Sequence, residues 1–281
     1  MTSIPPAEPH DTAASRWKRQ LETWAIPQEI LDRAPESPWG YSTSLFAKAA
    51  TAALEQAAPT PSRQRALEAL PDRGVVLDVG AGGGAAGLPL APPAGLVVAV
   101  DESRTMLAAF ANAATERQIE FELSEGRWPE VAPRAPAADV VVCHHVAYNV
   151  PDLAAFVQAL AGHARRRVVV ELTDTHPLSN LSPLWLSIHG IVRPTAPTAD
   201  DARQVAEGAG YDVRMQHFGR PSGWSHDRLQ ERVAQARKHL CVGPEHDAEI
   251  ADFFEKGDVP EAGTLVTLWW DVESDPFRSE G

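Results

Sequence analysis

The feature that most constrains the fold is a glycine-rich segment between two apolar runs. The first run, Val75–Val79, has the length and β-branched content of a buried strand, and Gly80–Gly84 follows it directly. The second run, Leu96–Val100, ends in Asp101. The pattern predicts a strand, a glycine turn that opens a helix, and a second strand that ends in a carboxylate. This is half of an α/β unit that binds nucleotides, in which the glycines let the backbone approach a ligand and the acid can hold a ribose.

Short apolar runs alternate with helical segments from residue 75 onward. Val140–Val142 is apolar without alternation, which indicates a strand buried on both faces, as in parallel sheets. We expect seven strands, at 75–79, 96–100, 119–123, 139–143, 167–172, 212–218 and 264–272. Helices are expected at about 103–116, 152–164 and 199–209. The alternation predicts the α/β class, with a Rossmann-like, doubly wound seven-stranded sheet.

Segments outside this alternation suggest additions to the sheet. Residues 1–12 are rich in proline, serine and threonine and are expected to be disordered, whereas residues 13–70 carry helical patterns and are expected to form an N-terminal helical cap. Residues 71–281 would form the main domain, with insertions at about 173–198 and 219–263. Because ligands bind at the carboxyl ends of strands in such sheets, we expect the insertions to form a lid.

Composition excludes several classes of partner. The formal net charge of −13 argues against nucleic acid, because a polyanion would meet a like-charge field. Cys143 and Cys241 lie too far apart in sequence to suggest a disulfide framework. No apolar run has the length of a membrane span, and no signal-peptide pattern stands at the start. We therefore expect a cytoplasmic protein with no membrane or nucleic-acid partner; the sequence predicts no oligomeric state.

The acid at position 78 distinguishes two cofactors that the glycine spacing allows. Residues 80–85 satisfy the G-x-G-x-x-G/A pattern of dinucleotide-binding proteins. An NAD pyrophosphate is anionic, so Asp78 beside the loop would repel it. S-adenosylmethionine carries a sulfonium and an ammonium instead, which Asp78 would attract, and Asp101 suits a ribose diol in either case. The two carboxylates favour S-adenosylmethionine.

The same residues resemble the motifs of the class I S-adenosylmethionine-dependent methyltransferases. The first motif, acid-x-Gly-x-Gly-x-Gly, is matched by Asp78, Gly80, Gly82 and Gly84, and the ribose-binding acid of the second motif by Asp101. This resemblance implies that S-adenosylmethionine is the cofactor, with S-adenosylhomocysteine as the product. It further implies a last strand that runs antiparallel to the others.

The later motifs of this family are matched less closely. Met106 resembles the segment that packs near the adenine, and Gly126 with Arg127 aligns with the third motif, where Arg127 replaces the acid that contacts the adenine amine. Residues 139–152 resemble the fourth motif, a strand followed by a histidine-rich turn. The resemblance therefore assigns the cofactor-binding role to Met106, Gly126, Arg127, Cys143 and His144 as well.

Three histidines are candidates for acid–base catalysis. His144 and His145 follow the fourth expected strand and His176 follows the fifth, at the edge where a bound cofactor would end. A histidine there can act as a general base for an acceptor hydroxyl or amine. An alternative is that one imidazole only orients the loop, because positioning of the nucleophile alone supplies much of the rate in methyl transfer. The spacing of these histidines matches no metal-ligand motif, so no metal is expected.

Several aromatic residues are candidates for the substrate lid. They stand between the N-terminal helices, after the fourth strand and in the insertions, namely Trp39, Tyr41, Tyr148, Trp185 and Trp224. Aromatic rings at such positions can stack on an adenine or on an apolar acceptor, although packing of the added helices on the sheet is the slightly favoured interpretation.

The sequence thus predicts an S-adenosylmethionine-dependent methyltransferase that acts on an O, N or C nucleophile of a small molecule. Two alternatives stay open: an NAD-dependent oxidoreductase, and a non-catalytic cofactor-binding protein of the same fold. The acceptor is not predicted, since fold-level analogy does not specify function.

Overall fold

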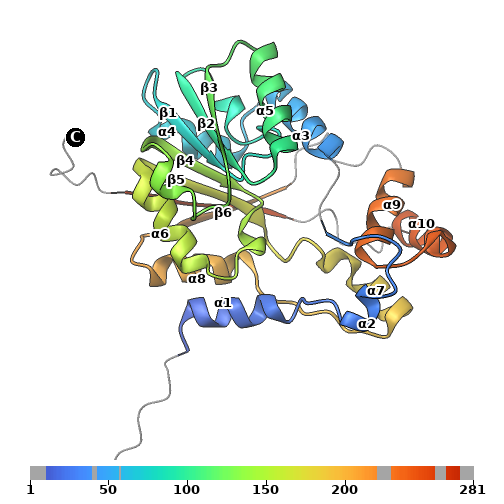
Figure 1. The fold of residues 1–281 in the computed structure, drawn as a ribbon. Helices are drawn as coiled ribbons and strands as arrows, with labels where there is room; N and C mark the ends of the chain where they lie inside the picture. The colour runs from blue at the N-terminus through green and yellow to red at the C-terminus, as the bar shows by residue number, and fades with distance from the viewer. Residues whose placement is uncertain (1–10, 40–42, 57, 220–228, 257–263, 273–281) are drawn as a thin grey trace, which may run out of the picture.

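The fold is centred on one seven-stranded sheet (Figure 1). The structure is a computed structural model and describes residues 11–39, 43–56, 58–219, 229–256 and 264–272. Its strands are β1 Val75–Val79, β2 Leu96–Asp101, β3 Phe121–Glu125, β4 Ala138–His144, β5 Ala164–Thr173, β6 Arg214–Phe218 and β7 Leu265–Asp271. All seven expected strands are present, with ends shifted by up to three residues.

The strand order is β3-β2-β1-β4-β5-β7-β6. β1 pairs in parallel with β2 and β4, while β7 lies between β5 and β6 and runs antiparallel to both. The predicted fold class, a Rossmann-like doubly wound sheet with an antiparallel last strand, is therefore confirmed. The order reverses between β2-β1 and β4-β5, and the crevice at such a reversal is where α/β sheets bind ligands.

Helices cover both faces of the sheet, and side chains alternate between two apolar cores. On one face, α1 (Ala13–Glu22), α6 (Leu153–His163) and α8 (Ala199–Gly208) pack over the side that carries Leu77 and Trp270. On the other, α3 (Thr43–Glu55), α4 (Pro61–Ala69) and α5 (Arg104–Glu116) cover the side that carries Val76 and Trp269. Figure 1 shows α6 and α8 across the sheet from α3 and α5.

A third apolar cluster lies beside the sheet. It joins α2 (Gln28–Leu31), α7 (Ser182–His189), α9 (Leu229–His239) and α10 (Asp247–Glu255), which Figure 1 shows grouped together. The two predicted insertions supply α7, α9 and α10. The four N-terminal helices are thus divided among both faces and this helical cluster, and a cap role for residues 13–70 stays a prediction.

Local sequence signals explain where several helices begin. The Ser103 side chain accepts a hydrogen bond from the Met106 backbone N–H at the start of α5, and Thr60 caps α4 in the same way with a proline at the first helical position. Thr198 and Asp201 form a reciprocal capping box at the start of α8. These side chains satisfy backbone N–H groups in the first turns of α4, α5 and α8 and so define where the three helices begin.

The expectation that the glycine turn opens a helix is wrong. Residues 80–95 form turns and a short 3-10 segment, Leu88–Leu90, in place of an α-helix. Proline has no N–H to donate and fixes its own backbone, and this stretch contains Pro89, Pro92 and Pro93. The N–H groups of Gly80, Ala81 and Gly84 donate to backbone carbonyls, and no α-helix dipole stands behind the glycine loop.

Candidate functional site

Four strands bring the predicted polar residues to one edge of the sheet. Because β2, β1, β4 and β5 are parallel neighbours, their carboxyl ends meet at the same edge. Asp78 is paired in register with Ala99 and Val142, and His144 with Glu171. The sheet thus assembles Asp78, Asp101, His144 and Glu171 from segments that span almost a hundred residues of chain.

The glycine loop sits between the end of β1 and the histidine turn after β4. Gly80 has a φ of 72°, and a Cβ added there would lie 2.3 Å from Val146 Cγ2. Only glycine adopts this conformation without strain and leaves room for the Val146 side chain. Gly82, with a φ of 51°, faces the ring of Phe46 from α3. Loop, histidine turn and α3 therefore meet at one place.

Asp78 carries a carboxylate that the protein itself does not fully satisfy. The residue is 0% exposed, and its Oδ2 accepts a hydrogen bond of 2.8 Å from the Gly87 backbone N–H. Its Oδ1 is buried and has no hydrogen-bond partner among the described residues. Burial, with a smaller contribution from the nearby Asp101 charge, raises the pKa of Asp78 to about 7. A cation at this edge would compensate the carboxylate.

Asp101 is held in place by two backbone donors. Its Oδ2 accepts a hydrogen bond of 2.8 Å from Gly82 N–H, and its Oδ1 accepts one of 2.8 Å from Ser103 N–H. Each carboxylate oxygen keeps a second lone pair. Asp101 is half-buried, so these lone pairs can accept hydrogen bonds from a diol.

The other predicted cofactor residues lie around this edge with different exposures. Met106 is half-buried in the first turn of α5, and Gly126 N–H donates to the Asp101 carbonyl. The Arg127 side chain is 62% exposed, and its Nε lies 4.0 Å from Glu102 Oε2. A contact of Arg127 with the cofactor would therefore have to come from its main chain. Cys143 is wholly buried in the core, and burial raises the pKa of its thiol, so its side chain is a packing group.

The two adjacent histidines both face Glu171. His145 Nε2 lies 3.2 Å and His144 Nδ1 3.9 Å from Glu171 Oε1. Burial lowers the pKa of His144, although the Glu171 charge opposes this. Glu171 is 3% exposed; burial alone would raise its pKa, but the two imidazoles and the Ser62 hydroxyl hold it well below the usual value. The carboxylate is therefore charged at neutral pH.

His176 is placed differently from the other two. Its ring stacks on Trp24, with centroids 3.8 Å apart, and its Nδ1 accepts a hydrogen bond from Leu178 N–H. Burial, with a smaller effect of the Arg193 charge, lowers the pKa of His176 to about 3. Both ring face and Nδ1 are engaged in packing, which leaves His176 the weakest of the three candidate bases.

The predicted lid residues divide into buried and exposed groups. Trp185 is 2% exposed inside the helical cluster, and Tyr148 is buried, with its hydroxyl donating to the Thr173 carbonyl. Their contacts in this structure are those of packing residues. Trp39 is 58% exposed. Tyr41 and Trp224 lie outside the described residues.

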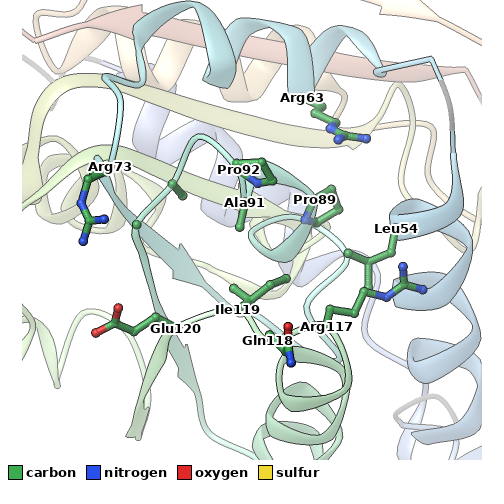
Figure 2. Close-up of a pocket in the computed structure, with 12 residues that line it drawn as sticks. Leu54, Arg63, Arg73, Pro89, Ala91, Pro92, Arg117, Gln118, Ile119 and Glu120 are labelled. Carbon is green, nitrogen blue, oxygen red and sulfur yellow. The ribbon is translucent and has the colours of Figure 1, made fainter.

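Two cavities lie at the opposite edge of the sheet. The cavity in Figure 2, of about 430 Å³, is lined by residues that precede β1, β2 and β3, among them Arg73, Gly95 and Glu120. The second lies beside Asp139 and Arg165, where β4 and β5 begin. Neither contains a predicted site residue, and parallel sheets bind ligands at the other edge.

Within the described ranges, no group of three or more His, Cys, Asp or Glu side chains is placed to hold a metal ion. In the same ranges, no helix has the length and hydropathy needed to cross a membrane.

Sequence reasoning missed three residues at this edge. Glu171 sits at the end of an otherwise apolar strand, Ser62 in the first turn of α4, and Phe46 on α3. The one signal for Glu171 was a charged residue within a continuous apolar run. No local signal marks Ser62 or Phe46, because their roles depend on how α3 and α4 pack on the sheet.

Comparison with known families identifies the central part of the chain. Residues 76–167, which include β1, β2, β4 and the histidine turn, match the family model described as methyltransferase domain. No curated protein matches the chain in sequence.

Solved structures share the fold at low sequence identity. A cyclopropane-fatty-acyl-phospholipid synthase-like protein from Lactobacillus casei aligns with a TM-score of 0.53 and 16% identity, over 90% of this chain and 99% of its own. YcgJ from Bacillus subtilis gives a TM-score of 0.52 and 16% identity, over 75% of this chain and 97% of its own. A candidate methyltransferase from Bacillus halodurans aligns with a TM-score of 0.50 and 18% identity, over 75% of this chain and 96% of its own. Residues 76–167 therefore match a methyltransferase domain in sequence, and the solved structures show that the chain shares their fold.

Proposed function

We propose that this methyltransferase moves the methyl group of S-adenosylmethionine to an O, N or C nucleophile of a small molecule. The observation that carries the proposal is the buried Asp78 carboxylate beside the glycine loop, whose Oδ1 has no partner in the part of the chain that the structure describes. A buried carboxylate without a counter-charge is costly unless a cation reaches it. The ammonium of S-adenosylmethionine supplies that cation.

The residues at the edge fit the rest of the cofactor. Asp101 would accept from the ribose hydroxyls with the lone pairs that Gly82 and Ser103 leave available. Positive φ values at Gly80, Gly82 and Gly84 keep side chains off the loop surface. Met106 and the main chains of Gly126 and Arg127 would line the adenine, and the main chains of Cys143 and His144 would face the methionine part.

The missing helix after β1 weighs against the dinucleotide alternative. A pyrophosphate gains much of its binding from a helix N-terminus, which residues 80–95 lack. Asp78 would add like-charge repulsion. Both features disfavour NAD and leave a cationic cofactor unaffected.

The chemistry of methyl transfer places few demands on the protein. When bound, S-adenosylmethionine supplies an electrophilic methyl group on sulfur. The chain must hold the acceptor atom in line with that bond, and such positioning accounts for a large part of the rate. A small acceptor is supported by the net charge, which disfavours nucleic acid, and by the exposed Trp39, which can stack on an organic ring. We place the reaction in the cytoplasm, where the two free cysteines would stay reduced.

Calorimetric titration with S-adenosylhomocysteine and with NAD tests this proposal. The wild type should bind S-adenosylhomocysteine, and Asp101→Ala should weaken binding at least about tenfold, which corresponds to roughly 1.4 kcal/mol. Asp72→Ala, an exposed site in the turn before β1, is the matched control and should leave the affinity unchanged. Binding of NAD alone would overturn the proposal.

The non-catalytic alternative predicts a different outcome. It expects S-adenosylhomocysteine and S-adenosylmethionine to bind, with no methylated product from any acceptor in a broad panel of phenols, amines and carboxylic acids. Release of S-adenosylhomocysteine with one of these acceptors would exclude it.

A further inference from the structure

The cavity in Figure 2 lies at the amino ends of β1, β2 and β3, and the proposed function uses none of the residues that line it. Its volume is about 430 Å³, which is within the range of pockets that hold small organic ligands. Three arginines line it, Arg63, Arg73 and Arg117, whereas Glu120 is the one acid among the described residues of the lining. This local excess of positive charge contrasts with the formal net charge of −13 for the whole chain.

The charged side chains occupy two ends of the cavity. Figure 2 shows Arg63 and Arg117 at the end beside Leu54 of α3, and Arg73 with Glu120 at the opposite end. The Glu120 carboxylate can offset the charge of Arg73 through space. At the end that holds Arg63 and Arg117, the described lining contains no acid, so the positive charge of this end is not offset.

Arg63 is a half-buried cation that its own surroundings do not satisfy. It lies in the first turn of α4, where the helix dipole disfavours a positive charge, and this turn contains no acidic residue. Its Nη1 donates to the Gln56 carbonyl at 3.4 Å, while its Nε is buried and has no hydrogen-bond partner among the described residues. Burial also lowers the pKa of Arg63. A buried donor without a partner costs stability, and an anion in the cavity would supply that partner.

The second cavity at the same edge of the sheet shows the opposite arrangement. Arg165 Nη1 and Arg166 Nε lie 3.9 Å and 3.7 Å from the two carboxylate oxygens of Asp139. The arginines of that cavity therefore have a counter-charge within the protein. In the part of the chain that the structure describes, neither Arg63 nor Arg117 forms an ion pair with a carboxylate. The first cavity alone has arginines whose charge a ligand would neutralise.

The lining indicates what kind of anion would fit. A guanidinium binds phosphate and carboxylate groups through parallel N–H donors. Two guanidinium groups at one end match a dianion better than a single carboxylate, and a phosphate monoester carries about −1.5 to −2 charges at pH 7. The middle of the cavity is apolar and includes Pro89, Pro92 and Ile119. This surface suits a ligand that carries an apolar body next to its anionic group.

We propose that this cavity is a second ligand site, which binds a small organic phosphate monoester with Arg63 and Arg117 as its phosphate-binding groups. The apolar body of the ligand would lie against the middle of the cavity. The inference goes beyond the proposed function and does not depend on it, because the cavity and the cofactor edge lie at opposite ends of the same strands. The phosphate monoester and the cofactor should therefore bind at the same time.

Calorimetric titration of the full chain with phenyl phosphate tests the proposal. The wild type should bind phenyl phosphate, whereas phenol, which has the same ring without the charge, should not bind. Arg63→Met and Arg117→Met should each weaken binding at least about tenfold, because methionine keeps an apolar stem and loses the charged donors. Arg166→Met, in the second cavity, is the matched control and should leave the affinity unchanged.

Three results would overturn the proposal. They are the absence of phenyl phosphate binding in the wild type, binding of phenol with a similar affinity, and an affinity for phenyl phosphate in Arg117→Met equal to that of the wild type. Arg117 is exposed at the end of α5, so its variant should fold, and it decides the matter if Arg63→Met does not fold.

A second titration separates this inference from the proposed function. Saturation with S-adenosylhomocysteine should change the affinity for phenyl phosphate by no more than about twofold, because the two sites lie at opposite edges of the sheet. Displacement of phenyl phosphate by S-adenosylhomocysteine would place the anion at the cofactor edge and overturn the second site. Failure of S-adenosylhomocysteine itself to bind would refute the proposed function instead, while phenyl phosphate would still bind.

Discussion

At the residue scale, the edge of the sheet contains two buried carboxylates that the protein treats in opposite ways. Glu171 faces the imidazoles of His144 and His145, and these groups with the Ser62 hydroxyl hold its pKa well below the usual value. Asp78 has one donor, Gly87 N–H, and its pKa is raised to about 7. Although both side chains are buried, the pKa of Glu171 is lowered and that of Asp78 is raised. Of these two carboxylates, only Asp78 keeps a buried oxygen without a hydrogen-bond partner in the described part of the chain.

Asp78 should make the ligand-free protein less stable as the pH rises. The unfolded chain loses the proton near 3.8, whereas the folded protein keeps it up to about 7. Between these values the folded state binds more protons, so its stability falls with increasing pH, by about 4 kcal/mol in total at about 1.4 kcal/mol per unit. Asp78→Asn removes this loss. Its free energy of unfolding in urea should exceed that of the wild type progressively from pH 4 to pH 8.

The same substitution should weaken cofactor binding, because asparagine offers no charge to the ammonium. Asp72→Asn, in an exposed turn, is the control for the urea series. Equal stability of Asp78→Asn and wild type at every pH would show that the carboxylate is compensated within the protein. A gain in stability combined with an affinity for S-adenosylhomocysteine at least about tenfold lower would support its ligand-binding role.

At the element scale, continuous apolar runs located the strands, and prolines explain the one wrong expectation near the site. Val75–Val79 was predicted to the residue, because four of its five residues are apolar and the run is bounded by a turn and by Gly80. The helix expected after it fails because the dinucleotide pattern concerns the glycines and ignores Pro89, Pro92 and Pro93. The insertions gave no strong periodicity, so α7 and α10 were not predicted.

The glycine loop and the histidine turn pack closely at Gly80 and Val146, so a side chain added at position 80 should destabilise the fold. Gly80→Ala places a Cβ 2.3 Å from Val146 Cγ2 at a φ of 72°, and we expect a loss of about 2–3 kcal/mol in the free energy of unfolding. Gly162→Ala, in α6 with no atom within 4 Å of the new Cβ, should be neutral or stabilising by up to about 1 kcal/mol. Both are measured by urea unfolding.

A second substitution separates the clash from the backbone strain. Val146→Ala in the Gly80→Ala background removes the atom that the new Cβ meets and leaves the positive φ as it is. We expect Gly80→Ala to lower the free energy of unfolding less in the Val146→Ala background than it does in the wild type. An equal loss of stability in both backgrounds would mean that the clash with Val146 costs nothing, and that glycine is required at position 80 only because of its positive φ.

At the scale of the whole molecule, the sequence predicted the parts of the site that lie on one local pattern and missed those that depend on packing. Asp78, Asp101 and the histidine pair each follow a predicted strand, so the parallel sheet itself brings them together. The hydrogen bond between Ser62 Oγ and Thr267 Oγ1 joins α4 and β7, and the two residues lie 205 positions apart in sequence. No periodicity in the sequence reports such a contact, because it arises only when α4 packs across the sheet.

At the scale of the whole molecule, the helical cluster is also a candidate lid over the acceptor, because it packs apart from the sheet. The glycine loop and the histidine turn belong to the sheet edge, whereas α7, α9 and α10 pack in a cluster of their own with α2. If the insertions close over the acceptor and not over the cofactor, S-adenosylhomocysteine alone should slow amide hydrogen exchange at residues 78–84, 101–106 and 143–146. Exchange in α7, α9 and α10 should then slow only when an acceptor is added as well.

Hydrogen exchange followed by mass spectrometry measures both steps on the full chain. Helix α6, which packs on the sheet away from the helical cluster, is the internal control and should not respond to either ligand. Slowing of α9 and α10 by S-adenosylhomocysteine alone would assign the cluster to the cofactor site. No response of the cluster to cofactor and acceptor together would instead make it a structural addition, with its buried Trp185 a packing residue. The lid would then have to come from α3, whose Phe46 already faces Gly82 across the glycine loop.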